Sequence, residues 1–282
     1  MDEVQEKIDI KRKRRSGNAR EDMDLGDGTD AFRGVATGAL AGRRDGRSTG
    51  EMRGLKVTQD FLSQADGSGR ICVGKTEVLA AVYGPTDCPV NKQNVDRAIL
   101  NVVWKFTSDE NASSYENDVE ELFSGAVQLE ANPRKALAVI VHVVSDEGGV
   151  LAAAINAVSI ALLDSGVPMK YFPTAASIAI TAGELLVDPD KPEEAEAEAS
   201  SVFAFSRISS TETGALLVRV YGDVGGDHLF RAACSIAQEV SLKTCAFLKS
   251  AVGRKIQMTR QNLYPGDNTT AVKEATSSSS LS

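Results

Sequence analysis

Apolar and polar residues follow two different periods along this chain, and the two periods predict its strands and helices. Segments that alternate between apolar and polar residues, or that stay apolar for a few residues, are typical of strands. The turn residues Asp66-Gly67-Ser68-Gly69 help to join the first segments into an antiparallel meander. The strands predicted in this way are 55–61, 70–74, 76–83, 98–106, 136–144, 174–182, 184–188, 202–207 and 215–221.

Three longer segments show the helical period instead. Residues 117–130 carry their apolar side chains in one stripe, which predicts an amphipathic helix that ends near Pro133. Residues 150–164 are apolar almost all round, so this helix must be buried on most faces, with Gly166 as its C-terminal stop. A third helix is expected over 227–253. The order of elements predicts a mixed α/β (α+β) fold, in which mixed sheets are covered by helices and the central helix is covered on two sides.

The two ends of the chain differ from its middle. Residues 1–42 mix charges with Gly and Asp and have no sustained apolar period, which predicts a disordered charged tail. Residues 261–282 are rich in Ser and Thr and are expected to form a flexible tail. Residues 43–260 are therefore expected to form the folded domain, with halves at about 43–182 and 183–260.

Charge and cysteine content narrow the class of protein. The net charge is −8, and from residue 43 onward 23 basic residues face 30 acidic ones, a balance of −7. Nucleic-acid affinity comes largely from basic side chains, so this chain is expected to bind RNA weakly by itself. The basic block Lys11 to Arg15 is either a solvated charge run, a nuclear-import signal or an RNA-contacting arm.

No apolar run approaches the ~20 residues of a membrane span. The four cysteines lack Cys-x-x-Cys spacing, which favours free thiols in a soluble, intracellular protein.

The strongest candidate site is the turn between strand 136–144 and helix 150–164. Gly148 and Gly149 lead directly into the helix, and such a turn points free backbone N–H groups at a ligand, as in a phosphate cradle. However, the side chains at the mouth are Val150 and Leu151, which donate no hydrogen bond and carry no charge. The sequence therefore predicts the scaffold of a phosphate site without its ligands.

Several motifs resemble the RNase PH family. Arg43-Arg44-Asp45-Gly46-Arg47, followed by Glu51 and Arg53, resembles its N-terminal signature, and Asp66-Gly67-Ser68 and Gly84-Pro85 continue the likeness. The resemblance spans about 43–255 and implies an RNase PH fold, a ribosomal-protein-like βαβα domain. The central segments 143–157 and 161–169 resemble RNase PH-like ring subunits of the eukaryotic RNA exosome, in which six such subunits surround an RNA channel.

The resemblance also implies where catalytic groups should lie. Active members attack RNA with phosphate, which they hold with a hydroxyl residue and an arginine after the Gly-Gly turn and with arginines from the preceding helix. Here those positions hold Val150 and Leu151, helix 117–130 has no arginine, and the essential aspartate position falls on Ser200. The resemblance therefore implies no catalytic residue, no cofactor and no metal. Lys92, Arg97 and Arg134 are candidate contacts to RNA at the channel wall, although an ordinary surface charge is the favoured interpretation for each of them.

Two functions follow as hypotheses. The first is a non-catalytic ring subunit of the RNA exosome, which scaffolds the channel for 3′-to-5′ RNA processing, rRNA processing and RNA degradation. Its partners would be other RNase PH-like ring subunits, cap subunits with OB-fold and KH modules, and RNA, in the nucleus, nucleolus and cytoplasm. The alternative is an independent homo-oligomeric nuclease, phosphorolytic or dependent on a metal held by acidic residues. Those acids are Asp188, Asp190, Glu193 and Glu194.

Overall fold

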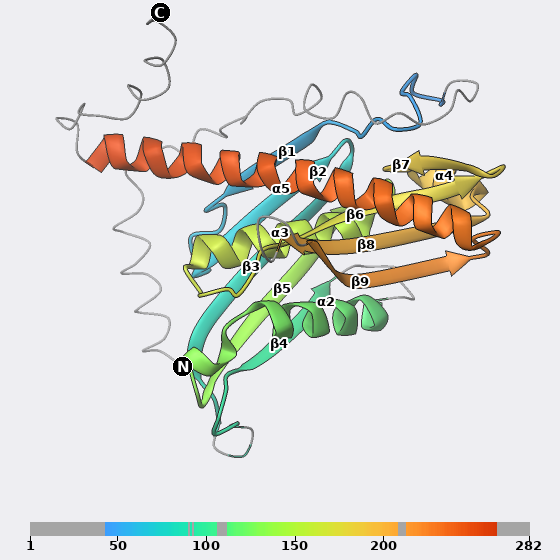
Figure 1. Cartoon of the computed structure of the whole chain (residues 1–282). Coiled ribbons are helices and arrows are strands. Elements are labelled where there is room, and N and C mark those ends of the chain that lie inside the picture. Colours follow the sequence, from blue (N-terminus) through green and yellow to red (C-terminus); the bar gives the residue numbers. More distant parts are fainter. Residues whose placement is uncertain (1–42, 90, 92, 106–111, 208–212, 264–282) are drawn as a thin grey trace, which may run out of the picture.

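The computed structural model describes residues 43–89, 91, 93–105, 112–207 and 213–263. Its first half is a five-stranded sheet in the order β1-β2-β3-β5-β4 (Figure 1). The strands are antiparallel except for β4 and β5, which run parallel because helix α2 connects them. The bounds are β1 Leu55–Gln59, β2 Gly67–Val73, β3 Thr76–Asp87, β4 Ile99–Lys105 and β5 Lys135–Ser145.

The second half is a four-stranded antiparallel sheet in the order β7-β6-β8-β9. Its strands are β6 Pro173–Thr181, β7 Glu184–Val187, β8 Ala199–Arg207 and β9 Thr213–Gly222. The helices are α2 Ala112–Ala126, the 3₁₀ helix η3 Leu129–Ala131, α3 Val150–Ser165, α4 Lys191–Glu196 and α5 Asp227–Leu263. The sequence predicts a boundary between the two halves at 182/183, which lies between β6 and β7. Because these two strands pair with each other, β6 belongs to the second sheet.

Helix α3 lies between the two sheets, and α5 covers the other face of the second sheet (Figure 1). This confirms the buried central helix, whose apolar residues from 151 to 162 are at most 6% exposed. Close packing requires a glycine on β2, because a Cβ at Gly69 would lie 2.8 Å from the carbonyl oxygen of Ala157. Gly166 ends the helix in the left-handed conformation with φ 73°, as expected for a C-terminal stop.

The helix boundaries differ from the sequence prediction. Helix α2 begins at Ala112 because Ala112 and Tyr115 in its first two turns pack against the core, and it ends at Ala126 before η3. Helix α5 continues past Gly253, where an added Cβ would meet no atom within 4 Å, and reaches Leu263, inside the segment expected to be a tail. None of the described helices combines the length and the apolar character that a membrane crossing needs.

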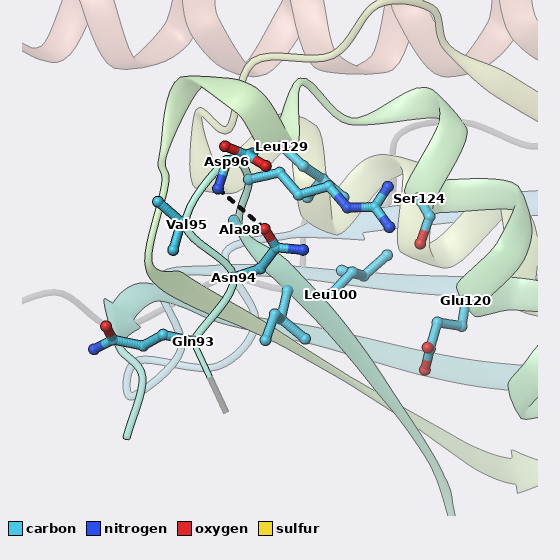
Figure 2. Close-up of a pocket in the computed structure, with 11 residues that line it drawn as sticks. Gln93, Asn94, Val95, Asp96, Ala98, Leu100, Glu120, Ser124 and Leu129 are labelled. Atoms are coloured by element: carbon cyan, nitrogen blue, oxygen red, sulfur yellow. Dashed lines mark hydrogen bonds between the residues drawn. The ribbon is translucent and has the colours of Figure 1, made fainter. Parts of the chain in front are cut away.

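An open cavity of about 510 Å³ lies between α2 and the start of β4 (Figure 2). Its wall includes polar groups from the loop before β4, among them Asn94 and Arg97, and Glu120 and Ser124 from α2. Trp104 of β4 is 7% exposed, and its ring centroid lies 5.3 Å from that of Tyr115 of α2.

Candidate functional site

The turn between β5 and α3 has the geometry that the sequence predicts. Gly148 and Gly149 adopt φ of 97° and 69°, conformations that residues with a Cβ rarely adopt, and Val150 begins the helix. A Cβ at Gly148 would lie 2.6 Å from the carbonyl oxygen of Pro189. Glycine is therefore required both by the backbone conformation and by the segment that packs over the turn.

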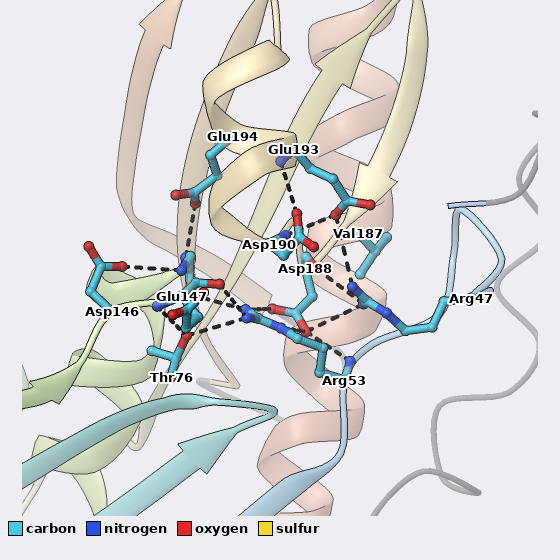
Figure 3. A network of polar contacts seen from close by, with 12 residues as sticks. Arg47, Arg53, Thr76, Asp146, Glu147, Val187, Asp188, Asp190, Glu193 and Glu194 are labelled. Atoms are coloured by element: carbon cyan, nitrogen blue, oxygen red, sulfur yellow. Dashed lines mark hydrogen bonds and ion pairs between the residues drawn. The ribbon is translucent and has the colours of Figure 1, made fainter. Parts of the chain in front are cut away.

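Carboxylates of the chain itself occupy this turn (Figure 3). The N–H of Gly149 donates to Oε1 of Glu194 at 2.9 Å, and the N–H of Gly148 donates to Oδ1 of Asp146 at 3.1 Å. A helix N-terminus favours a negative charge, but the carboxyl group of Glu194, which lies at this end of α3, is also partly buried, and burial disfavours its charged form. Burial raises the pKa of Glu194 to about 7, an effect that the nearby Asp146 charge reinforces and the Gly149 hydrogen bond opposes.

A buried arginine joins this turn to the end of β7 (Figure 3). Arg53 grips the Asp188 carboxylate with two hydrogen bonds, from Nη2 at 2.7 Å and from Nε at 2.9 Å. Its Nη1 also donates to the carbonyl of Glu147 at 2.7 Å, and its Nη2 to that of Gly148 at 3.0 Å. Burial lowers the pKa of Arg53, but Asp188 outweighs it and the pKa is raised. Arg53 therefore has a structural role: its guanidinium group donates to Asp188 and to the backbone of the turn, and we call this arrangement a clamp.

The acidic segment after β7 forms a helix that packs over the turn. Asp190 caps α4 by accepting from the N–H of Glu193 at 2.9 Å, and the Glu193 side chain accepts from the N–H of Asp190 at 2.9 Å. Arg43 holds Glu193 through Nε at 2.7 Å, and Lys191 contacts Asp146 at 2.7 Å. The carboxylates weighed as metal ligands thus contact cations or backbone groups. Among the described residues no cluster of three or more His, Cys, Asp or Glu is arranged to hold a metal.

The structure places Ser200 in a strand of the second sheet. Sequence reasoning put Ser200 in the acidic loop, whereas it belongs to β8, opposite Ala179 of β6 and Tyr221 of β9. Strand alternation puts its side chain on the sheet face shared with Val202, which packs in the core with α3. Val150 is half-buried and Leu151 is 3% exposed, so Leu151 is a core residue.

Helix α2 brings acidic groups where the family resemblance implies arginines. Asp118 is 8% exposed and pairs with Nη1 of Arg219 from β9 at 3.2 Å. Burial raises the pKa of Asp118, and the charge of Arg219 acts in the opposite direction. Glu120 accepts from the N–H of Val102 at 3.4 Å. Arg219 is thus committed to a carboxylate and is not left to bind a phosphate.

The residues expected to touch RNA lie away from this turn. Arg97 and Arg134 are both exposed, and the N–H of Arg134 donates to the carbonyl of Asn94 at 3.0 Å, so their two loops are adjacent. Lys92 lies outside the described residues. These exposed arginines share one end of the five-stranded sheet, and whether they contact RNA stays a prediction.

Comparison with known proteins identifies the family. The model of the 3′ exoribonuclease family, domain 1 (RNase PH), matches residues 51–168. The chain is 35% identical to "Exosome complex exonuclease RRP46 homolog" of Arabidopsis thaliana over 168 residues, which is 58% of this chain and 70% of that protein. The chain belongs to the RNase PH family. The RRP46 homolog of Oryza sativa subsp. japonica is 34% identical, over 60% of this chain and 74% of the relative.

Solved structures agree with this assignment. The crystal structure of rice Rrp46 superimposes with a TM-score of 0.70 at 26% identity, covering 75% of this chain and all of that one. An archaeal exosome core chain gives a TM-score of 0.65 at 20% identity and covers 74% of this chain and 91% of its own, which supports the fold. The RNase PH fold expected from the sequence is therefore confirmed.

Proposed function

We propose that the chain is a non-catalytic RNase PH-like subunit of an RNA exosome core, with a structural role in 3′-to-5′ RNA processing and degradation. The relatives that support this are exosome components by name, including Rrp41 of Archaeoglobus fulgidus, 29% identical over 76% of this chain and 87% of the relative. In this proposal the partners are other RNase PH-like ring subunits, cap subunits with OB-fold and KH modules, and RNA in the assembled channel. The proposed location is the nucleus, the nucleolus and the cytoplasm.

One observation carries the proposed loss of catalysis: the Gly149 N–H at the α3 N-terminus is bonded to Glu194. Phosphorolysis needs oriented donors or cations around two phosphate groups that repel each other. Here the turn holds carboxylates, and Arg53 is already bonded to Asp188. A phosphate entering this turn would displace Glu194 and meet the negative charge of Asp146, which disfavours binding.

The alternative of an independent nuclease takes its support from the word exonuclease in the names of the plant relatives. It requires the chain to act alone, as a homo-oligomer, and to bind RNA without help. The acidic balance of the residues after 42 argues against tight RNA binding by the chain alone.

The test is the native mass of the complex purified from cells through a tag on the full-length chain. The proposal expects a hetero-oligomer that contains other RNase PH-fold subunits together with cap subunits. RNA titrations should show weak binding by the lone chain and stronger binding by the complex. A homo-oligomer that binds RNA tightly and degrades it would overturn the proposal and favour the independent nuclease.

A further inference from the structure

The open cavity between α2 and the start of β4 has room for a small ligand. Its volume of about 510 Å³ lies within the range of about 300–1,000 Å³ that is typical of ligand pockets. Figure 2 shows Leu100 between Asn94 on one side and Glu120 and Ser124 of α2 on the other. Part of the wall is apolar and consists of three side chains that are at most 4% exposed, those of Ala98, Leu100 and Leu129. The cavity therefore offers an apolar surface flanked by polar groups.

A positive charge lines the cavity on the side of the loop before β4. Arg97 is exposed, and its guanidinium group makes no hydrogen bond or ion pair with the residues that the structure describes. Arg53 and Arg219 differ from it, because both are bonded to carboxylates of the chain. A guanidinium group without an acidic partner is well suited to bind a phosphate. Arg97 can therefore offer its donors to an anionic ligand.

A second exposed arginine lies beside the cavity. Arg134 belongs to the loop whose N–H bond to the carbonyl of Asn94 joins it to the cavity wall. Its φ of 60° is a left-handed conformation that residues with a Cβ rarely adopt. Its side chain also lacks a hydrogen bond or ion pair to any described residue. A phosphate chain that leaves the cavity on this side would meet a second guanidinium group.

Helix α2 supplies a carboxylate to the same cavity. Glu120 is half-buried, and its Oε2 accepts from the N–H of Val102 at 3.4 Å, a long hydrogen bond. Its Oε1 accepts from no residue in the described part of the chain, and the Ser124 hydroxyl one turn later has no partner there either. A carboxylate repels phosphate and accepts from hydroxyl groups. The ligand that suits this cavity therefore carries both an anionic group and a hydroxyl group.

We propose that the cavity binds one ribonucleotide, whose phosphate contacts Arg97 and whose ribose 2′-hydroxyl donates to Oε1 of Glu120. The base would then cover the apolar wall. The 2′-hydroxyl is the group by which a protein distinguishes RNA from DNA, whereas a phosphate contact alone makes no such distinction. A residue of an RNA strand and a free mononucleotide share this chemistry. The inference deepens the proposed function and rests on it, because a subunit of an RNA exosome core meets RNA.

The test measures how strongly the full-length chain prefers RNA to DNA. Fluorescence anisotropy at low salt gives the affinities for a short oligouridylate and for the oligodeoxyuridylate of the same length. Glu120→Ala removes a negative charge, which by electrostatics alone would tighten the binding of both strands. We expect instead that the ratio of RNA affinity to DNA affinity falls about threefold or more, because a hydrogen bond to the 2′-hydroxyl is lost.

Glu121→Ala is the matched control for this variant. Glu121 is the next residue of α2, it is exposed, and it does not line the cavity. The control makes the same change in charge and should leave the ratio of affinities as in wild type. A lower ratio in Glu120→Ala alone therefore reports a contact with the ribose and not a change in net charge.

A second variant does not touch the core. Arg97→Gln should weaken the binding of both strands and lower the slope of log affinity against log salt by about 0.7 for the phosphate contact that is lost. Arg254→Gln, at an exposed arginine of α5 outside the cavity, should bind like wild type.

Competition with uridine 5′-monophosphate separates the two sources of the ribonucleotide. If the oligouridylate binds more tightly than the mononucleotide, and Arg134→Gln weakens only the oligouridylate, the ligand is a residue of an RNA strand. Equal affinities, with no effect of Arg134→Gln, assign the cavity to a free mononucleotide.

The outcomes also separate this inference from the proposed function. The inference is overturned if Glu120→Ala and Glu121→Ala give the same ratio of affinities, if Arg97→Gln binds like wild type, or if the chain binds neither ribonucleotide ligand at low salt. The proposed function fails on a different result: the tagged chain purified from cells carries no other RNase PH-fold subunit.

Discussion

Replacing Glu194 with Gln is expected to stabilise the folded protein above neutral pH and to leave its stability unchanged in acid. Glutamine keeps a side-chain oxygen for the Gly149 N–H, which Glu194 now accepts at 2.9 Å. The substitution removes the negative charge that lies near Asp146 and Asp188 and is disfavoured by burial. It therefore tests whether the negative charge of Glu194 at this turn lowers the free energy of unfolding.

The magnitude follows from the raised pKa. The pKa of Glu194 rises from 4.5 to about 7, so the folded protein holds this proton more tightly than the unfolded chain does. Stability contributed by this group is complete below about pH 4.5 and declines as the pH rises to about 7. The full shift corresponds to about 3 kcal/mol at most, and about 1–2 kcal/mol is expected because the half-buried carboxyl group keeps some contact with water.

The assay is urea unfolding of wild type and Glu194→Gln at pH 5 and pH 8. The two proteins should differ little at pH 5, and the variant should be the more stable at pH 8. Glu198→Gln is the matched control, because Glu198 is an exposed acid of the same segment and its change should have little effect at either pH. A variant less stable than wild type at pH 8 would refute the reasoning, since it would show that the charge is favourable at the helix N-terminus.

Three further predictions follow from the same network and core. Arg53→Ala removes both side-chain hydrogen bonds to buried Asp188 and leaves it one described ion pair, the 3.8 Å contact with Arg47, so it should lower the free energy of unfolding by about 3–5 kcal/mol. Arg70→Ala, on the sheet surface, should lower it by about 1 kcal/mol or less in the same denaturant titrations. Equal losses would contradict the structural role given to Arg53. Ala157→Phe should overpack α3 against β2 by about 1–3 kcal/mol, and an unchanged melting temperature would show that this contact is loose. Leu151→Arg should not restore phosphate-dependent RNA shortening in a folded variant, and measurable nucleoside diphosphate release would contradict the proposed loss of ligands.

The elements of the core could be predicted from the sequence because their periods are unambiguous. The helix from Val150 is apolar all round and ends at a glycine, so both its burial and its end follow from composition. Helix starts and ends without such markers could not be placed as well. The first turns of α2 contain Ser113 and Ser114, which resemble a loop until their packing is seen, and α5 passes Gly253 without a break.

The chemistry of the candidate site was only half predictable. The glycines of the turn, the apolar residues after them and the absence of arginine on α2 are local features of the sequence. The role of Glu194 as the group bonded to Gly149 is not, because 45 residues separate the two partners. The only feature of the sequence that points to this contact is charge: segment 43–53 is rich in arginine and segment 188–198 is rich in acids. The fold brings these two segments together through the ion pair of Arg53 and Asp188.

The central claim is tested most directly by incubating the purified full-length chain with a 3′-tailed RNA and inorganic phosphate, and by measuring the release of nucleoside diphosphates. The account predicts no release, because Glu194 is bonded to the Gly149 N–H, and Val150 and Leu151 offer a phosphate neither a hydrogen-bond donor nor a charge. Phosphate-dependent release that disappears in the Glu194→Gln variant would contradict it, since the same carboxylate would then act in catalysis.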